Sequence, residues 1–475
     1  MQRNQDNQQR AVIIGGSLAG LLAARVLVDH FDQVTIIERD HFPATPTFRP
    51  GVPQGRHAHF LLVQGRLILE RLFPGITSDL KDAGAIEIDV TRDLLVNIQT
   101  RFMPRVASGN LVTLTMTREL LEWTIRQHLN GYSRVEIVTG YEATNFISNS
   151  TNTRIVGVRT CPRPIPGEIN GQDVTFHAEL IVDASGRNSR TPRWLSELGY
   201  APPKETTVNS FAAYATQWYE LSSSFNRDWQ ALAIHHTRSG VVYGVEHNRW
   251  VVTLSGAGHD YPPTDQIGFL DFARSLPVPD LHNALQNARP ISRIYGFRRN
   301  ENSLRHYEHL HRWPDRLVVL GDAVCTFNPI YAQGMTTSVL AAVTLDKCLG
   351  SYFRRRGERE LTGFAKYFQK RLAKTNTTPW LMATSEDFRH PATIGGKRNR
   401  MTQMFHTYLD QVQELAADRP SVYKTFAGVV QLVYSPLSLF QPSVLFPLLA
   451  RIIRQRLTHA LPARKSKKQG MINEV

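Results

Sequence analysis

Short apolar runs separated by polar turns recur along the 475-residue chain and predict an alternation of strands and helices. The first run, Ala11–Ile14, is continuously apolar, as is typical of a parallel strand covered on both faces. Residues 21–27 then form the apolar side of a helix, and Val34–Ile37 predicts the next strand. The order strand, turn, helix, strand indicates an α/β fold of the Rossmann-like kind.

The turn between the first strand and its helix reads Gly15-Gly16-Ser17-Leu18-Ala19-Gly20, with Ser17 where a dinucleotide-binding turn has its second glycine. The amides that open the helix can receive a pyrophosphate. Glu38 ends the second strand, followed by Arg39, and a carboxylate there can accept hydrogen bonds from ribose hydroxyls. The pattern predicts a dinucleotide site, and Glu38 favours FAD or NAD because it would repel the 2′-phosphate of NADP.

The pattern changes farther along the chain. Between about residues 211 and 295, alternating runs at 210–215, 240–245 and 249–254 predict antiparallel strands. After Leu361 the pattern is mainly helical. We therefore divide the chain into a first α/β part at 10–200, interrupted by strands near 85–115, an antiparallel sheet at 201–300, a return segment of the α/β domain at 301–360, and a helical region with a basic tail at 361–475.

Composition is ordinary for a globular protein, but the charge is uneven. Of the formal net charge of +14, residues 451–475 carry +6, seven basic residues minus one acidic, and residues 425–450 carry none. Two interpretations stay open for this end: peripheral contact with an anionic membrane face, or a packed helical cap with a solvated tail. No nucleic-acid-binding pattern is present, and the three cysteines lack metal or disulfide spacing. The N-terminus shows no signal-peptide pattern, which predicts a cytoplasmic protein, and the oligomeric state stays open.

Three further segments occur in a recognisable order: Thr117–Glu122, Val182–Arg187 and Gly321–Met335. Together with the glycine turn they resemble FAD-dependent monooxygenases of the aromatic-hydroxylase superfamily, over roughly residues 10–390. Within that superfamily, the segments Arg49–His59 and Phe327–Pro329 look closest to polyether epoxidases and related bacterial FAD-dependent oxidoreductases.

The resemblance implies a glutathione-reductase-type FAD-binding domain with an inserted antiparallel substrate sheet and a C-terminal helical region. Asp322 would accept a hydrogen bond from a ribityl or ribose hydroxyl, and Pro329 would lie against the flavin ring. The helix beginning at Gly334 and Met335 would stabilise negative charge on the reduced flavin. The full set of implied cofactor contacts is Gly15, Gly16, Ser17, Leu18, Ala19, Gly20, Glu38, Arg39, Arg49, Arg118, Asp183, Gly186, Gly321, Asp322, Pro329, Gly334 and Met335.

Some positions keep two interpretations. Arg118 matches a cofactor-contacting arginine, or forms a surface salt bridge to Glu122. His57 and His59 could neighbour the flavin, contact substrate, steer the hydride donor or fix their own loop; no further local ligand accompanies them, so no metal is assigned. Asp183 and Gly186 are separated by two residues that the related motif lacks, and Ala332 stands where relatives often have glycine.

The resemblance implies a cycle in which NAD(P)H reduces FAD and O2 gives a flavin C4a-hydroperoxide, which epoxidises or hydroxylates a lipophilic alkene or aromatic molecule. Such an enzyme would belong to secondary metabolism, and the flavin, not a side chain, would perform the chemistry. Three alternatives remain: a flavin-dependent reductase or dehydrogenase of the prenyl-chain reductase type, a flavin halogenase, and a non-catalytic flavin-binding protein. The chain contains no WxWxIP segment, which halogenases normally carry together with a lysine reached by hypohalite.

Overall fold

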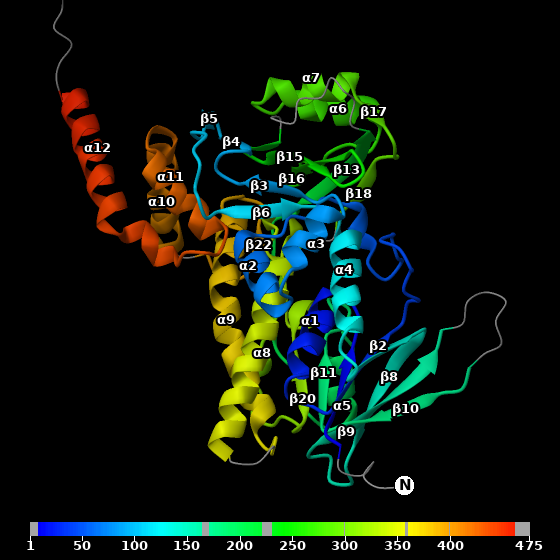
Figure 1. Ribbon diagram of the computed structural model, residues 1–475. Coiled ribbons are helices and arrows are strands. Elements are labelled where there is room, and N and C mark those ends of the chain that lie inside the picture. The colour runs from blue at the N-terminus through cyan, green and yellow to red at the C-terminus, as the bar shows by residue number, and fades with distance from the viewer. Residues whose placement is uncertain are drawn as a thin grey trace, which may run out of the picture.

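The computed structural model describes residues 8–163, 171–220, 230–298, 300–356, 360–398 and 400–460. Figure 1 shows a parallel sheet in the lower half of the view, an antiparallel sheet above it and the C-terminal helices at the upper left. The mixed α/β class expected from the alternating pattern is confirmed.

The parallel sheet collects strands from distant parts of the chain in the order β20-β11-β1-β2-β7. Its strands are β1 (Arg10–Ile14), β2 (Gln33–Glu38), β7 (Val135–Thr139), β11 (Leu180–Asp183) and β20 (Leu317–Val319). Residues 11–14 are at most 5% exposed, as expected for a strand covered on both faces. Helix α1 (Leu18–Leu27) contacts both α4 (Arg118–Asn130) and α8 (Gly334–Arg356), which belong to the layers around the sheet (Figure 1).

The antiparallel sheet has the order β17-β13-β16-β15-β14-β4-β5, with β18 also paired to β13. One pair, β14 with β4, is parallel. Its strands are β4 (Leu95–Ile98), β5 (Arg101–Phe102), β13 (Ala213–Glu220), β14 (Ala231–His235), β15 (Arg238–Val245), β16 (Arg249–Gly256), β17 (Arg289–Pro290) and β18 (Tyr295–Phe297). Helices α6 (Gln266–Arg274) and α7 (Pro279–Asn287) lie over it and share its core (Figure 1). The strand expected from residue 210 begins at Ala213, because Phe211 takes a φ of 50° and Ser210 bonds to Asp387 instead.

Smaller sheets and short helices complete the described part of the fold. Strands β8, β9 and β10 pair as one sheet, β3 pairs with β6, and β21, β19, β12 and β22 form another. The strand bounds are β3 (Ile86–Asp89), β6 (Val112–Thr115), β8 (Tyr141–Ser148), β9 (Ile155–Pro162), β10 (Val174–His177), β12 (Glu205–Asn209), β19 (Asn302–Arg305), β21 (Cys325–Thr326) and β22 (Ile394–Gly395). The short helices are α2 (Val63–Leu72), α3 (Ile76–Asp82), α5 (Thr191–Glu197) and the 3-10 turns η1 (Pro53–Arg56), η3 (Tyr307–His309), η4 (Gly321–Ala323) and η5 (Pro329–Tyr331).

The C-terminal region is helical in its described part apart from the short strand β22. Its helical elements are α9 (Phe364–Asp387), α10 (Arg400–Asp418), α11 (Pro420–Val430), the 3-10 turn η6 (Pro436–Phe440) and α12 (Pro442–Ala460). Buried residues of α10, α11 and α12 share one apolar cluster with residues near β3 and β4. No helix within the described ranges is long and apolar enough to cross a membrane. The basic residues predicted for the tail at 461–475 lie outside the described residues.

Candidate functional site

A cavity of ≈ 560 Å³ lies between the parallel and antiparallel sheets. Its lining includes Ile14, Glu38 and Ala184, which stand at or just after the carboxyl ends of β1, β2 and β11. Tyr214 of β13 and Phe297 of β18 line the same space. Crevices at the carboxyl ends of parallel strands are where open α/β sheets bind their ligands.

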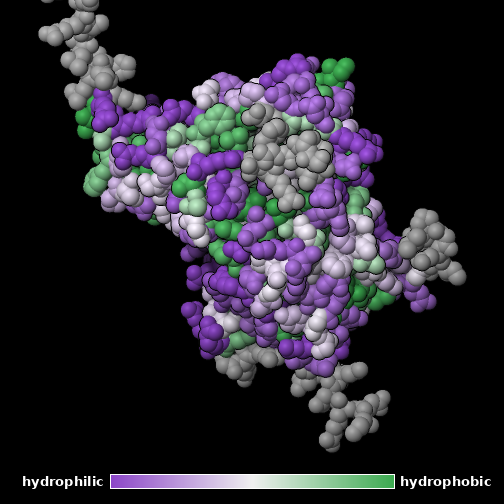
Figure 2. Space-filling view, turned by 45° about the horizontal axis from the view of Figure 1, so that its top comes forward, coloured by the Kyte–Doolittle hydropathy of each residue, from purple (hydrophilic) through white to green (hydrophobic). Residues whose placement is uncertain are grey.

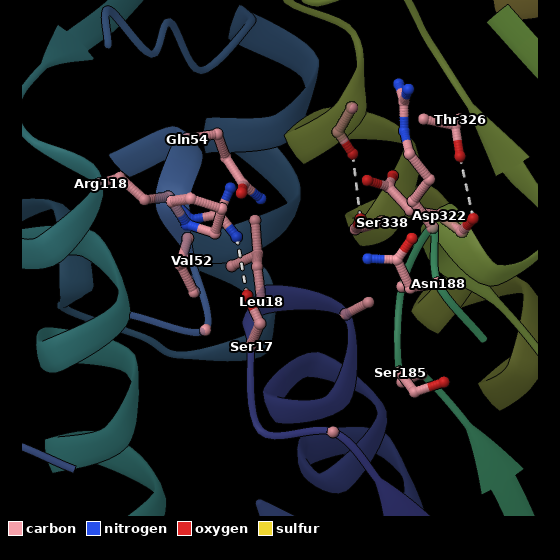
Figure 3. A pocket seen from close by; sticks show the side chains of 18 of the residues that line it. Ser17, Leu18, Val52, Gln54, Arg118, Ser185, Asn188, Asp322, Thr326 and Ser338 are labelled. Atoms are coloured by element: carbon pink, nitrogen blue, oxygen red, sulfur yellow. Dashed lines mark hydrogen bonds between the residues drawn. The ribbon is translucent and has the colours of Figure 1, made fainter. Parts of the chain in front are cut away.

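Most residues predicted to contact a cofactor meet at this cavity. Those that line it are Gly15, Ser17, Leu18, Ala19, Glu38, Arg39, Arg49, Arg118, Gly186, Asp322, Pro329, Gly334 and Met335, together with His57 and His59. Four residues predicted to contact the cofactor are not among the described lining residues: Gly16, Gly20, Asp183 and Gly321. Figure 3 shows two facing groups, with Ser17, Gln54 and Arg118 on one side and Asp322, Thr326 and Ser338 on the other.

The glycine turn is shaped by close backbone approaches. Gly15 has a φ of +102°, and a Cβ there would lie 2.6 Å from the carbonyl oxygen of Ala184. A Cβ on Gly20 would lie 1.8 Å from the Gly15 carbonyl oxygen, so only glycine fits. Gly16 donates its N–H to Glu38 Oε2 at 2.7 Å, which ties the turn to the end of β2. The turn therefore leaves Ser17, the N-cap of α1, facing the cavity.

Arg49 lies at the centre of a buried ion cluster. Its guanidinium is 3.5 Å from Glu38, 3.0 Å from Asp40 and 3.2 Å from Glu122. Burial works against its charge, but the three carboxylates outweigh burial and raise the pKa of Arg49. The cluster holds Glu38 beside the glycine turn, and Arg49 compensates the negative charge of Glu38.

Arg118 lines the cavity and also pairs with Glu122. It opens α4, lines the cavity and donates to Ser17 Oγ at 2.9 Å (Figure 3). It also donates to Glu122 Oε1 at 2.9 Å, but Glu122 is buried, so this is not the surface salt bridge considered from sequence. Burial favours the neutral form of Glu122, yet Arg118 and Arg49 outweigh it and lower the pKa of Glu122 to about 2.

The segment from Gly321 to Met335 lies along another side of the cavity. Gly321 has a φ of +64°, and a Cβ there would lie 2.8 Å from the Cβ of Ala19, which brings η4 close to α1. Burial raises the pKa of Asp322 against the opposing attraction of Arg187 and Arg118. Helix α8 begins at Gly334, as predicted, so its first amides lie at the cavity wall.

Behind this segment, a buried carboxylate holds the backbone in place. Asp387 accepts hydrogen bonds from Ser210, Asn302, Asn328 and Tyr331. Burial raises the pKa of Asp387 to about 6, although the hydrogen bonds from Tyr331, Ser210 and Asn328 oppose the shift. Asn328 and Tyr331 flank Pro329, so Asp387, although far along the chain, positions the cavity-lining proline. Local sequence patterns gave no signal for this pairing.

Asp183 organises the loop after β11. Its fully buried carboxylate accepts from the amide of Ser185 at 2.9 Å and from Thr191 Oγ1 at 2.6 Å, and also from the hydroxyl of Ser189. These contacts occupy the carboxylate within its own loop. The loop in turn presents Gly186 and Arg187 to the cavity.

His57 and His59 line the cavity as neutral groups. Burial, with a smaller effect of Arg56, lowers the pKa of His57 to about 4. Burial, followed by Arg118, lowers the pKa of His59 to about 3. His57 Nδ1 is 2.9 Å from Thr216 Oγ1 in β13, which ties its loop to the antiparallel sheet.

An aromatic wall adjoins His57. The rings of Tyr214 and Phe297 stack with centroids 5.3 Å apart, and His57 meets Tyr214 edge-on at 4.6 Å. Sequence reasoning placed a substrate sheet here but did not single out these two residues. The alternation of β13 could have indicated Tyr214, whereas nothing local marks Phe297 of the short strand β18.

The cavity residues fit a dinucleotide. A Cβ at Gly186 or Gly334 would meet no protein atom within 4 Å, so a side chain there would project into the cavity. The described charged lining residues are five arginines and three acids, which suits an anionic ligand. The arginines are Arg39, Arg49, Arg118, Arg187 and Arg190, and the acids are Glu38, Glu142 and Asp322.

Among the described residues, one group of side chains outside the cavity has the composition of a metal site. Ligand atoms of His306, Glu308 and His309 lie within 4.8 Å of one another. However, His306 already uses both ring nitrogens, toward Thr206 Oγ1 at 2.8 Å and Glu308 Oε1 at 2.9 Å. We assign no metal to it.

No family model matches the chain. It is 29% identical over 470 residues to protein Rv3254 of Mycobacterium tuberculosis, covering 97% of both chains. Among solved structures, the flavin-dependent brominase Bmp2 has a TM-score of 0.64 at 14% identity, covering 95% of this chain and all of that one. A flavoprotein/dehydrogenase from Cytophaga hutchinsonii gives 0.65 at 14%, covering 94% and 99%. PqsL from Pseudomonas aeruginosa, a probable FAD-dependent monooxygenase, gives 0.58 at 17%, covering 81% and 98%.

The chain therefore has a fold that these solved flavin-dependent enzymes and flavoproteins share. A flavin-dependent brominase, an FAD-dependent halogenase and a probable FAD-dependent monooxygenase share this fold, so the fold by itself does not distinguish these reactions.

Proposed function

We propose that the protein is an FAD-dependent monooxygenase that takes electrons from NAD(P)H and transfers one oxygen atom from O2 to a lipophilic alkene or aromatic molecule. One observation carries the proposal: a single cavity joins the glycine turn and Glu38 to the start of α8 and to the aromatic wall of Tyr214 and Phe297. In this proposal the side with the glycine turn and Glu38 is the cofactor end of the cavity, and the aromatic wall is its substrate end.

In this proposal FAD binds in the glutathione-reductase manner. The adenosine ribose would bond to Glu38, and the pyrophosphate would meet the amides that open α1 near Ser17. Asp322 would accept from a hydroxyl of the ribityl chain. Residues Pro329–Met335 would hold the ring, with the positive end of α8 favouring negative charge on it. When bound, the flavin supplies the electron and oxygen chemistry.

The substrate end favours an apolar planar molecule. Stacked rings and an edge-on imidazole provide apolar area with a defined orientation. His57 and His59 are neutral at neutral pH, so they would orient and desolvate a substrate without acting as cations. The similarity of Arg49–His59 and Phe327–Pro329 to polyether epoxidases supports an alkene and epoxidation.

The cavity supports oxygen transfer over halogenation, although brominase and halogenase structures share the fold. Halogenases use a lysine ammonium that hypohalite reaches. No lysine is among the described residues that line the cavity. Together with the missing WxWxIP segment, the lysine-free described lining favours oxygen transfer over halogenation.

The test is NAD(P)H-dependent turnover of the FAD-loaded protein with isotope-labelled O2, with and without bromide, against a panel of lipophilic alkenes and phenols. We expect substrate-stimulated O2 uptake and a product that carries one labelled oxygen atom. A brominated product would establish a halogenase instead. A substrate reduced without O2 would establish the reductase, and FAD-loaded protein that consumes neither NAD(P)H nor O2 with any member of the panel would contradict the proposal.

A further inference from the structure

Helix α12 is apolar on two faces. One face packs inward through Val444 and Leu448, which are at most 3% exposed. The other carries Phe446, Leu449 and Ile453, which are 69%, 52% and 58% exposed. Their i, i+3, i+7 spacing aligns them over about 10 Å of helix. A surface helix normally places polar residues on its outer face, so this face is unusual.

The neighbouring elements extend this surface. Leu437 in η6 is 75% exposed, and Phe440, 41% exposed, stacks on Tyr408 of α10 with ring centroids 4.6 Å apart. Met404, one turn before Tyr408, is 73% exposed. Figure 2 shows green side chains at the left edge of the molecule, where the C-terminal helices lie. We define the C-terminal apolar surface as Met404, Leu437, Phe440, Phe446, Leu449 and Ile453.

The acids of α10 are paired with arginines, and the sequence from Arg451 onward is basic. Helix α10 contains three acidic residues, and each is paired. Asp410 pairs with Arg389 at 2.7 Å, and Glu414 and Asp418 pair with Arg451 at 3.0 and 2.9 Å. Residues 425–450 carry no charge. After Arg451 the sequence adds six basic residues against Glu474, a net charge of +5.

We propose that the C-terminal apolar surface docks the protein on the face of an anionic lipid bilayer, with α12 lying along the interface. Large apolar side chains beside a cluster of basic residues are what such an interface binds. Electrostatics argues against a second copy of the chain as the occupant, because pairing two such ends would bring two net charges of +5 together. Docking would place the enzyme where a lipophilic substrate is concentrated.

The experiment is flotation of full-length, FAD-loaded protein with vesicles of phosphatidylglycerol or of phosphatidylcholine. We expect recovery with the anionic vesicles only, reduced by added salt. Replacing Phe446, Leu449 and Ile453 by Gln should lower the apparent affinity by about tenfold or more, since each side chain buries substantial apolar area. Replacing Ile267 and Ile291 by Gln, which are 76% and 45% exposed elsewhere, should leave recovery unchanged.

The basic contribution is tested separately by replacing Arg464, Lys465, Lys467 and Lys468 with Gln, which should remove the preference for anionic vesicles. Circular dichroism and melting temperature confirm that each variant is folded. The proposal is overturned if the parent protein does not float with anionic vesicles, or if the triple Gln variant floats equally well. It is also overturned if light scattering shows a dimer that the triple variant dissociates, because the surface would then be a protein interface.

Discussion

The buried carboxylate of Glu122 offers a quantitative test of how the cavity wall is stabilised. It lies 2.9 Å from Arg118 and 3.2 Å from Arg49, and these two arginines lower its pKa from 4.5 to about 2 in spite of burial. A shift of this size corresponds to about 3 kcal/mol of stability at neutral pH. Glu122→Gln keeps the shape but removes the charge, so we expect the free energy of unfolding to fall by about 3 kcal/mol, as for other broken buried pairs.

The pH dependence of this effect has a definite sign. Because folding lowers the pKa of Glu122, its stabilisation is present above its unfolded pKa of 4.5 and is lost as pH falls toward about 2. The difference between parent and variant should therefore shrink from about 3 kcal/mol at pH 7 to less than about half of that at pH 3.

Urea unfolding followed by circular dichroism measures this difference. Glu220→Gln is the control, because Glu220 pairs with Arg289 at 3.0 Å on an exposed surface and should change stability by less than about 1 kcal/mol. A Glu122→Gln protein with the urea midpoint of the parent, or with a deficit that does not change with pH, would refute the reasoning.

Three further predictions concern the cofactor end of the cavity. Asp322→Ala and Arg118→Ala should each weaken FAD binding by about tenfold or more, because each removes one charge-assisted hydrogen bond. Titration of flavin fluorescence measures the FAD affinity, and an unchanged affinity in both variants would contradict their assigned roles. Asp387→Asn replaces an acceptor of four hydrogen bonds by a group that also donates. It should lower the free energy of unfolding in urea by about 1–3 kcal/mol and weaken FAD binding. Unchanged stability and unchanged FAD affinity would contradict its positioning role. Ala332→Gly should stabilise the protein by about 1 kcal/mol, because Ala332 has a φ of 54° that glycine adopts without strain; a lower melting temperature would count against this.

Local sequence signals predicted the parts of the fold that local physics determines. The continuous apolar run of β1, the glycine turn and the start of α8 at Gly334 follow from side-chain periodicity and backbone geometry over a few residues. The strand at residue 210 was placed too early, because the bond from Ser210 to Asp387 joins positions 177 residues apart. No periodicity encodes such a contact.

The residues of the cavity could likewise be predicted only in part from the sequence. Glu38, Arg118 and Asp322 were predicted from motifs, and the structure brings all three to one space. The ion cluster of Arg49 with Glu122 could not be predicted, because it depends on the packing of α4 against the loop after β2. Phe297 was missed for a similar reason, since the short strand β18 acquires its role only by pairing with β13.

The most direct test of the account is a crystal structure of the protein with FAD bound. The account predicts the adenosine ribose at Glu38, the pyrophosphate at the start of α1, and the flavin ring between the start of α8 and the wall of Tyr214 and Phe297. FAD bound outside this cavity, or in the opposite direction with its adenine at the aromatic wall, would contradict it.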